Sequence, residues 1–309
     1  MGTTQRVLIS AQELKRRLDD GESTVILDVR WALGGPDGRE AYYETHIPGA
    51  VFADLARELA VPVESGSAEE AAGGRHPLPS REQFEESARR WGINNGDSVV
   101  VYDDSTGQTA ARAWWMLRDA GLPDVWILDG GLAAWQRGDY PLESGTREVA
   151  PGRVRLGAGA LATIDADEAA HYPGVLLDAR AGERYRGEVE PVDPRAGHIP
   201  GAVSAPTSGN LADDGAFLPA EELRRRFAAL GVEAGRPVAV YCGSGVTAAH
   251  DVAALAIAGI DAALYPGSFS QWSRDPSRPV AVGPEPRGER SREADASGMS
   301  SADGIASEA

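Results

Sequence analysis

Short, continuous runs of apolar residues alternate with amphipathic stretches along most of this chain. The apolar runs are rich in β-branched residues and span Val25–Asp28, Val99–Asp103, Val125–Asp129, Val175–Asp178 and Val238–Cys242. Segments with apolar residues at helical spacing lie between them, at Arg81–Trp91, Thr109–Ala120, Ala220–Leu230 and Thr247–Gly259. Strands buried on both faces are apolar throughout, and alternation with helices favours parallel pairing. The pattern predicts an α/β protein whose parallel sheets are flanked by helices.

The pattern occurs twice. The hexapeptide His-Ile-Pro-Gly-Ala-Val begins at His46 and recurs letter for letter at His198. The two copies begin 152 residues apart, and a spacing this large indicates a duplicated domain rather than a short structural repeat. We expect an N-terminal domain at 1–145, a linker within 140–155 and a C-terminal domain at 155–282. Residues 283–309 are rich in Gly, Ser, Glu, Arg and Asp with scarcely an apolar anchor, which predicts a disordered tail.

Composition excludes several classes of function. The net charge of −17 argues against nucleic acid or an anionic membrane as a partner. No apolar run approaches the roughly 18 residues of a membrane span. We also find no signal peptide, and a single cysteine permits no internal disulfide, so we expect a cytoplasmic protein. Five scattered histidines and one cysteine form no metal-ligand cluster, and no motif predicts an organic cofactor.

The single cysteine, Cys242, ends one of the predicted strands and precedes a predicted helix. A thiol there faces backbone N–H groups and the positive end of the helix dipole, which favours the thiolate. Gly243 and Gly245 allow the intervening loop to turn its amides toward an anion. A free cysteine is more often a small buried apolar residue. The strand, glycine-rich loop and helix together favour a nucleophile instead.

The duplicated halves, the repeated His-Ile-Pro-Gly-Ala and the segment Cys242-Gly-Ser-Gly-Val-Thr-Ala248 together resemble the tandem-domain rhodanese family of sulfurtransferases. The resemblance covers roughly residues 5–282 and implies two rhodanese-like domains, of which the C-terminal one is catalytic. Asp103 occupies the position equivalent to Cys242, so the resemblance implies an inactive N-terminal domain. It implies sulfur transfer from a small anionic donor, 3-mercaptopyruvate or thiosulfate, through a persulfide on Cys242. The acceptor would be cyanide, a small thiol or a thioredoxin-like protein.

The same resemblance implies roles for other residues. Arg184 would hold the anionic end of the donor, as a guanidinium suits a carboxylate. Ser244 would relay a proton, and His76 would reach the cleft from the N-terminal domain. Arg186 is a weaker candidate for donor binding. The remaining loop residues expected to contact the donor are Gly243, Gly245, Val246 and Thr247, and Thr247 could also cap the following helix.

Two positions depart from the mercaptopyruvate branch of the family. The acidic residue that orients the histidine there aligns with Ala56, and Asp54 lies two positions away. The second carboxylate-binding arginine aligns with Val192, and Arg195 could replace it. The loop resembles the mercaptopyruvate branch, because no basic residue follows the cysteine. A thiosulfate:cyanide sulfurtransferase and a sulfur carrier without turnover remain alternatives. A cysteine phosphatase is disfavoured, because its longer anion-binding loop closes with an arginine.

Other distinctive residues are expected to serve the structure. His46 and His198 should make buried hydrogen bonds, because both domains share them outside the unique loop. Asp28 and Asp178 should form ion pairs or caps at strand ends. Four tryptophans are expected in the core: Trp114, Trp115, Trp135 and Trp272.

Overall fold

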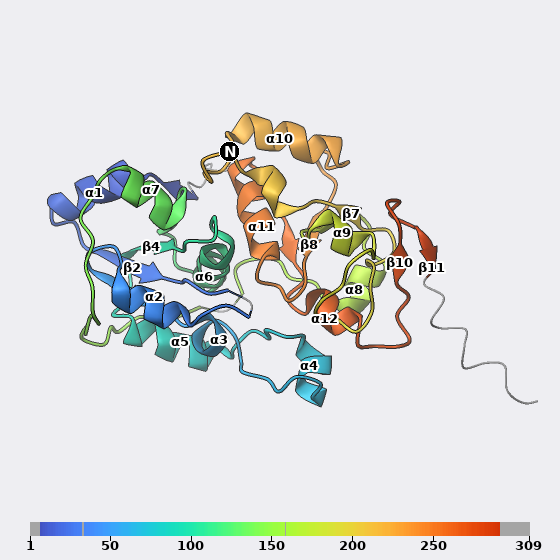
Figure 1. The fold of residues 1–309 in the computed structure, drawn as a ribbon, viewed down its shortest axis with the longest axis horizontal. Helices are drawn as coiled ribbons and strands as arrows, with labels where there is room; N and C mark the ends of the chain where they lie inside the picture. Colours follow the sequence, from blue (N-terminus) through green and yellow to red (C-terminus); the bar gives the residue numbers. More distant parts are fainter. Residues whose placement is uncertain (1–6, 33, 158, 291–309) are drawn as a thin grey trace, which may run out of the picture.

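The computed structural model describes residues 7–32, 34–157 and 159–290, which form two lobes side by side (Figure 1). The N-terminal sheet has the order β1-β5-β4-β2-β3 and is entirely parallel. Its strands are β1 (Leu8–Ile9), β2 (Thr24–Asp28), β3 (Ala50–Phe52), β4 (Ser98–Tyr102) and β5 (Val125–Leu128). The C-terminal sheet, also parallel, has the order β7-β6-β8-β9. Its strands are β6 (Val175–Asp178), β7 (Val203–Ser204), β8 (Val238–Tyr241) and β9 (Ala263–Leu264).

Helices flank both sheets, as the alternation of apolar runs predicts. The N-terminal lobe contains α1 (Ala11–Asp19), α2 (Gly38–Glu44), α3 (Leu55–Glu58), α4 (Ala68–Gly73), α5 (Arg81–Arg90), α6 (Gln108–Asp119) and α7 (Gly131–Arg137). The C-terminal lobe contains α8 (Ala166–Ala170), α9 (Gly182–Tyr185), the 3₁₀ turn η1 (Thr207–Asn210), α10 (Ala220–Ala229), α11 (Ala248–Ile257) and α12 (Ser268–Trp272). In the part of the chain that is described, no helix is long and apolar enough to cross a membrane.

Local sequence explains where the elements begin and end. All five predicted strands are present, each within one residue of its expected ends. The start of α5 is fixed by a capping box, in which Ser80 accepts from the amide of Gln83 and the Gln83 side chain accepts from the amide of Ser80. All four predicted helices are present, with ends that shift by one or two residues.

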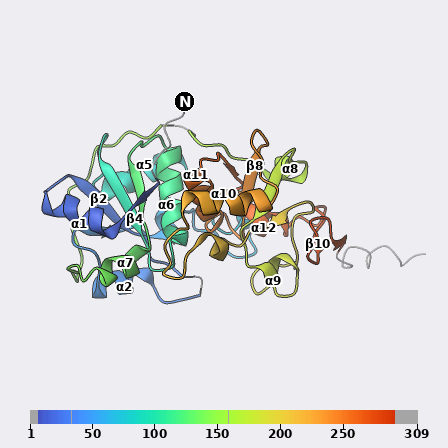
Figure 2. The ribbon, with the colours of Figure 1, turned by 90° about the horizontal axis from the view of Figure 1, so that it is seen from above.

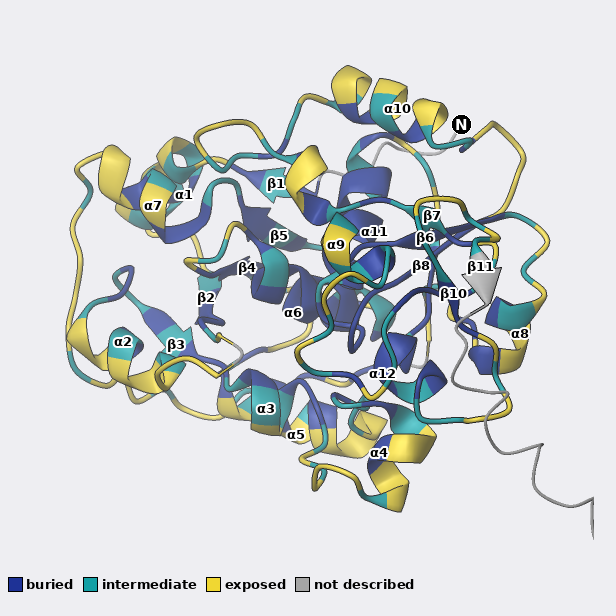
Figure 3. Ribbon diagram, turned by 45° about the vertical axis from the view of Figure 1, so that its right-hand side comes forward, coloured by how far each residue is buried: buried dark blue, intermediate teal, exposed yellow. Residues whose placement is uncertain are grey.

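The two lobes share one apolar core through α6 and α11. These helices lie against each other between the sheets (Figure 2), and a single cluster of buried apolar side chains runs from β4 and α6 into α11 and β8. Eight of the ten residues of α11 are buried, and both central helices are dark blue along most of their length in Figure 3. A second contact joins α4 to α12. Any cleft between the lobes therefore has rigid walls.

The end of the chain departs from expectation. The sequence predicts a disordered tail from residue 283 onward, but residues 283–290 fold back and place β11 (Glu289–Arg290) antiparallel to β10 (Ala281–Val282). The carbonyl of Pro286 accepts hydrogen bonds from the amide of Gly201 and from His198 Nε2, which attaches this segment to the C-terminal lobe. The sequence gives no indication of this ordered segment, because its contacts are made by backbone groups and not by apolar side chains. The rest of the expected tail, 291–309, lies outside the described residues.

The residues expected to serve the structure make the expected ion pairs, buried hydrogen bonds and core contacts. Asp28 and Asp178 each bind the arginine two positions later, with shortest oxygen–nitrogen distances of 2.8 and 2.7 Å. Nδ1 of His46 and of His198 lies 2.8 Å from a backbone carbonyl oxygen, and both side chains are buried. The four tryptophans are at most 5% exposed. These predictions are confirmed.

Candidate active site

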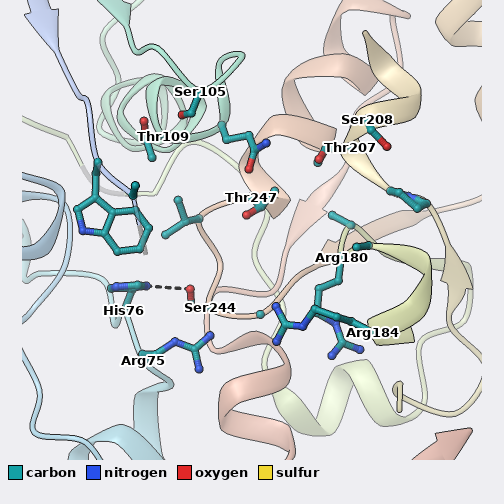
Figure 4. A pocket seen from close by; sticks show the side chains of 18 residues that line it. Arg75, His76, Ser105, Thr109, Arg180, Arg184, Thr207, Ser208, Ser244 and Thr247 are labelled. Carbon is teal, nitrogen blue, oxygen red and sulfur yellow. Dashed lines mark hydrogen bonds between the residues drawn. The ribbon is translucent and has the colours of Figure 1, made fainter. Parts of the chain in front are cut away.

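A cavity of about 440 Å³ opens between the two lobes, lined in part by residues that follow β4, β6 and β8 (Figure 4). Its N-terminal wall consists of Trp31, Ala32, Arg75, His76, Ser105, Gln108 and Thr109. Its C-terminal wall consists of Ala179, Arg180, Ala181, Arg184, Pro206, Thr207, Ser208, Gly243, Ser244, Val246 and Thr247. The site therefore requires both halves of the duplication. Three of the four loop residues expected to contact the donor lie in it (Gly243, Val246 and Thr247), as does Ser244, whereas Gly245 and Cys242 are not part of the lining.

Cys242 follows β8 at the base of the loop and is 1% exposed. Its Sγ accepts a hydrogen bond from the amide of Gly245 at 3.1 Å, as the expected anion-binding loop requires. Gly245 has φ +77°, and a Cβ there would overlap the carbonyl oxygen of Pro266. No other residue type fits without strain, so this glycine fixes the amide that points at the sulfur.

The equivalent loop of the N-terminal lobe is closed around its own carboxylate. Asp103 accepts hydrogen bonds from the amides of Ser105, Gly107, Thr109 and Ala110 and from the Thr109 hydroxyl, at 2.8–2.9 Å. This loop shows that amides after such a strand converge on a negative charge at the position of Cys242. It also shows a second reason, beyond the missing thiol, for expecting no chemistry in this lobe: the anion site is filled.

Ser244 and His76 form a pair across the domain boundary. His76 Nδ1 lies 2.8 Å from Ser244 Oγ, and the indole of Trp31 packs edge-on against the imidazole with centroids 5.3 Å apart. Burial, together with the charges of Arg112 and Arg75, lowers the pKa of His76 to about 3. The imidazole is therefore neutral near pH 7 and able to exchange a proton with the serine.

Among the described residues, no carboxylate hydrogen-bonds to this histidine. Asp54 caps α3, where its Oδ1 accepts from the amide of Ala56 at 3.1 Å and its Oδ2 lies 3.7 Å from Arg39. Asp54 therefore does not take the place of the carboxylate expected at Ala56. Trp31 and the hydrogen bond to Ser244 hold the ring instead.

Two arginines from different domains meet over Gly243. Arg184 donates to Glu190 Oε1 at 2.6 Å and to Asp193 Oδ2 at 3.0 Å, while Arg75 donates to Asp193 Oδ1 at 2.7 Å. A Cβ added to Gly243 would lie 3.2 Å from Arg75 Nη2 and 3.6 Å from Arg184 Nη1. Neither of these two nitrogens has a hydrogen-bond partner among the described residues. Figure 4 shows both side chains reaching the same part of the cavity from opposite walls. No sequence pattern predicts a role for Arg75, because only the fold brings it to the loop.

Three other candidates have different positions from those expected. Arg186 does not line the cavity, and its guanidinium pairs with Glu188 at 2.7 Å. Arg195 does not replace the arginine missing at Val192, because it donates to four backbone carbonyls around the end of α12. Thr247 lines the cavity but makes no side-chain capping hydrogen bond to α11.

The segment 74–76 attaches the N-terminal wall to the C-terminal lobe. Gly74 has φ +79°, and a Cβ there would overlap the carbonyl oxygen of Gly267 and lie 2.8 Å from Ser270 Oγ. The amide of Arg75 donates to the same Ser270 Oγ at 3.0 Å. Close approach at Gly74 thus sets where Arg75 and His76 enter the cavity. Within the described ranges, no three His, Cys, Asp or Glu side chains gather as metal ligands.

Comparison with known proteins agrees with this architecture. The family model for the rhodanese-like domain matches residues 10–138 and again residues 159–275. The chain belongs to the rhodanese family. Its two matches place it among the tandem-domain members, and it is a sulfurtransferase.

Named relatives span nearly the same length as this rhodanese. It is 48% identical over 283 residues to a putative thiosulfate sulfurtransferase, SseB, of Mycobacterium tuberculosis, covering 90% of this chain and 98% of that one. It is 48% identical over 286 residues to a probable 3-mercaptopyruvate sulfurtransferase of Pseudomonas aeruginosa, covering 89% and 98%. The crystal structure of SseA, a 3-mercaptopyruvate sulfurtransferase of Escherichia coli, matches with a TM-score of 0.73 and 34% identity, covering 86% of this chain and 99% of that one.

Proposed function

We propose that this rhodanese transfers sulfur from 3-mercaptopyruvate to a thiophilic acceptor through a persulfide on Cys242. The observation that carries the choice of donor is the pair of guanidinium groups, Arg75 and Arg184, that flank Gly243 beside the cysteine. Arg75 Nη2 and Arg184 Nη1 can each donate to one oxygen of a carboxylate, so the donor is clamped from both domains. Arg75 then does the work of the arginine absent at Val192.

The reaction has two steps. The Cys242 thiolate attacks the sulfur of the donor, an S–S bond forms, and the C–S bond breaks. The electron pair of the broken C–S bond stays on the carbon, which gives the enolate of pyruvate. This carbon then takes up a proton from the Ser244 hydroxyl. The neutral His76 then exchanges the proton of that hydroxyl with solvent. In the second step a thiolate or cyanide attacks the outer sulfur, and Cys242 leaves as a thiolate.

The charge around the loop supports a monocarboxylate over dianionic thiosulfate. Residues 243–247 include no basic side chain, and two carboxylates, Glu190 and Asp193, already neutralise part of the arginine pair. The third arginine of the lining, Arg180, is committed to Asp178 through its Nε and Nη2. A second negative charge on the donor would have no further cation to meet.

Acceptor and location follow from the same chemistry. A cavity open at the surface admits cyanide, a small thiol or the exposed thiol of a thioredoxin-like protein. A reducing cytoplasm would keep the single cysteine as a thiol between turnovers. The thiophilic acceptor and the cytoplasmic location are therefore both part of the proposal.

Mass spectrometry tests the nucleophile. Incubation with 3-mercaptopyruvate should add about 32 Da, one sulfur atom, to Cys242, and Cys242→Ser should not gain it. An unmodified wild-type protein would contradict the proposal. Continued release of pyruvate with excess cyanide or dithiothreitol should show many turnovers, and a single turnover would indicate a sulfur carrier.

Steady-state kinetics test the donor. We expect kcat/KM for 3-mercaptopyruvate to exceed that for thiosulfate, and Arg75→Gln and Arg184→Gln each to raise KM about tenfold or more, the loss of one charge-assisted hydrogen bond. The matched control is Arg57→Gln, which removes the same charge from a side chain that is 77% exposed. A higher kcat/KM for thiosulfate, or unchanged KM in both cleft variants, would overturn the choice of donor.

A further inference from the structure

Arg112 is a fully buried cation at the centre of the molecule, 0% exposed on α6. Its Nε and Nη2 donate to the carbonyl of Leu59, its Nη2 also to that of His76 at 3.1 Å, and its Nη1 to that of Gly245 at 3.2 Å. One guanidinium thus ties the N-terminal wall of the cleft to the loop of the nucleophile. It binds the carbonyl of the same residue whose amide donates to Cys242 Sγ.

The charge of Arg112 is not balanced by a carboxylate. Among the described residues no Asp or Glu acts on the pKa of Arg112, although a buried cation is costly without a counter-charge. Burial lowers the pKa of Arg112 to about 10, and the negative charge of Cys242 opposes that shift. The guanidinium therefore stays charged at neutral pH, and Cys242 is the one described residue whose charge acts on its pKa.

The opposite domain makes the reciprocal contact. Thr109-Ala-Ala-Arg112 on α6 matches Thr247-Ala-Ala-His250 before and on α11. His250 Nε2 donates to the carbonyl of Thr106 at 3.2 Å, and Thr106 is three residues after Asp103 as Gly245 is three after Cys242. Thr106 and Gly245 both have positive φ, of 62° and 77°. Each domain therefore hydrogen-bonds, from the helix that follows its own loop, to a backbone carbonyl in the loop of the other.

The two contacts differ in charge. His250 is fully buried, and burial lowers its pKa to about 4, so it is neutral at pH 7. A neutral group faces the loop that holds Asp103, and a cation faces the loop that holds the thiol. The two domains therefore share a similar contact to the opposite loop, but the group that makes it is charged in one domain (Arg112) and neutral in the other (His250).

We infer that Arg112 is a positioning residue through which the inactive domain holds the Cys242 loop and favours negative charge on its sulfur. The inference rests on the proposed function, since it concerns the thiolate and persulfide of that cysteine. Its action is exerted through the Gly245 peptide and through the field of the guanidinium, without contact with the donor. The other charged or titratable groups around the loop are Arg75, His76 and Arg184, and the test leaves all three in place.

Alkylation tests the inference directly, because the chain contains one cysteine and iodoacetamide reports on it alone. At pH 7 we expect Arg112→Gln to slow alkylation about tenfold, the effect of losing one nearby opposite charge on thiolate formation. The rate of persulfide formation at saturating 3-mercaptopyruvate should fall in parallel, while KM changes little. His250→Gln, the matched control in the other contact, should alkylate at a rate close to wild type.

A purely structural role has the opposite signature. If Arg112 only held the domains together, its loss would expose Cys242, which is 1% exposed, and alkylation would become faster. A faster or unchanged rate in Arg112→Gln would therefore overturn the inference. If Arg112→Gln does not fold, Arg112→Lys provides the test, because lysine keeps the positive charge but lacks the planar guanidinium that binds several carbonyls. We then expect slower persulfide formation at unchanged KM. Failure of the proposed function would appear instead as a missing sulfur adduct in the wild-type protein, whatever the alkylation rates.

Discussion

The substitution Gly74→Ala offers a sharp test of how the two domains meet. Gly74 has φ +79°, and its added Cβ would overlap the carbonyl oxygen of Gly267. A matched control exists at Gly96, which has φ +88° and no heavy atom within 4 Å of the same added Cβ. Both substitutions place an alanine in the left-handed region, at a cost of about 1–2 kcal/mol. Only Gly74→Ala also requires the domains to move apart.

The difference between the two variants measures the close approach. Overpacking a tight contact costs a further 1–3 kcal/mol or so, which gives about 2–5 kcal/mol for Gly74→Ala against about 1–2 kcal/mol for Gly96→Ala. The added Cβ would lie 2.8 Å from Ser270 Oγ, so the segment must retreat by roughly 1 Å to reach an ordinary contact. That retreat carries His76 away from Ser244 and Arg75 away from Asp193, bonds that are now 2.8 and 2.7 Å long.

Activity should respond as well. A displacement of about 1 Å in a positioning group can lower the rate about 100-fold, so kcat/KM for 3-mercaptopyruvate should fall by that order in Gly74→Ala and stay near wild type in Gly96→Ala. Urea unfolding gives the stabilities, and pyruvate release gives the rates. Equal losses of stability in the two variants, with kcat/KM preserved in Gly74→Ala, would refute the argument from close approach.

Three further variants probe the proton relay, the closed loop and a buried carboxyl. Ser244→Ala should lower kcat/KM for 3-mercaptopyruvate about 100-fold and for thiosulfate far less, because only the first needs a proton on carbon; equal losses, measured as pyruvate and sulfite release, would contradict the relay with His76. Asp103→Asn should cost about 2–3 kcal/mol in urea unfolding, since an amide group cannot accept all five hydrogen bonds, yet the sulfur adduct should still form on the cysteine. Burial raises the pKa of Asp251 to about 7, so the native protein retains a proton that the unfolded chain has lost, and this carboxyl's contribution to stability falls as pH rises from about 3.8 to about 7. Asp251→Asn removes that dependence, so its Tm relative to wild type should rise between pH 5 and pH 8, and a constant difference would show that the carboxyl does not titrate there.

Much of the fold could be predicted because the central strands are recognisable from their own residues. Val175–Asp178, apart from its terminal aspartate, and Val238–Tyr241 are apolar throughout and lie at the centre of their sheet, so burial on both faces is visible in the sequence. The segment around Pro286 left none, because its contacts use backbone atoms. Short strands such as β9, of two residues, carry too few positions to form a pattern.

The candidate site divides in the same way. Cys242 and Ser244 belong to one loop with a recognisable composition, and the structure brings Ser244 to the cleft. Arg75 and Arg112 act on a loop of the other domain, with Arg112 bonded to a residue 133 positions away. No local pattern encodes such a contact. Arg186, the weaker candidate, follows the four-residue helix that carries Arg184, and only the placement of that helix shows that Arg184 alone of the two lines the cavity.

The shared core between α6 and α11 has a consequence for how this protein unfolds. Almost every side chain of α11 is buried, partly by the other domain, so a C-terminal domain released from its partner would expose a long apolar helix to water. The two halves should therefore melt in a single cooperative transition rather than in two steps, despite their separate sheets. Duplicated domains usually gain the freedom to evolve apart. Here each half has become part of the other's interior, and the loss of a nucleophile in one was compatible with keeping both.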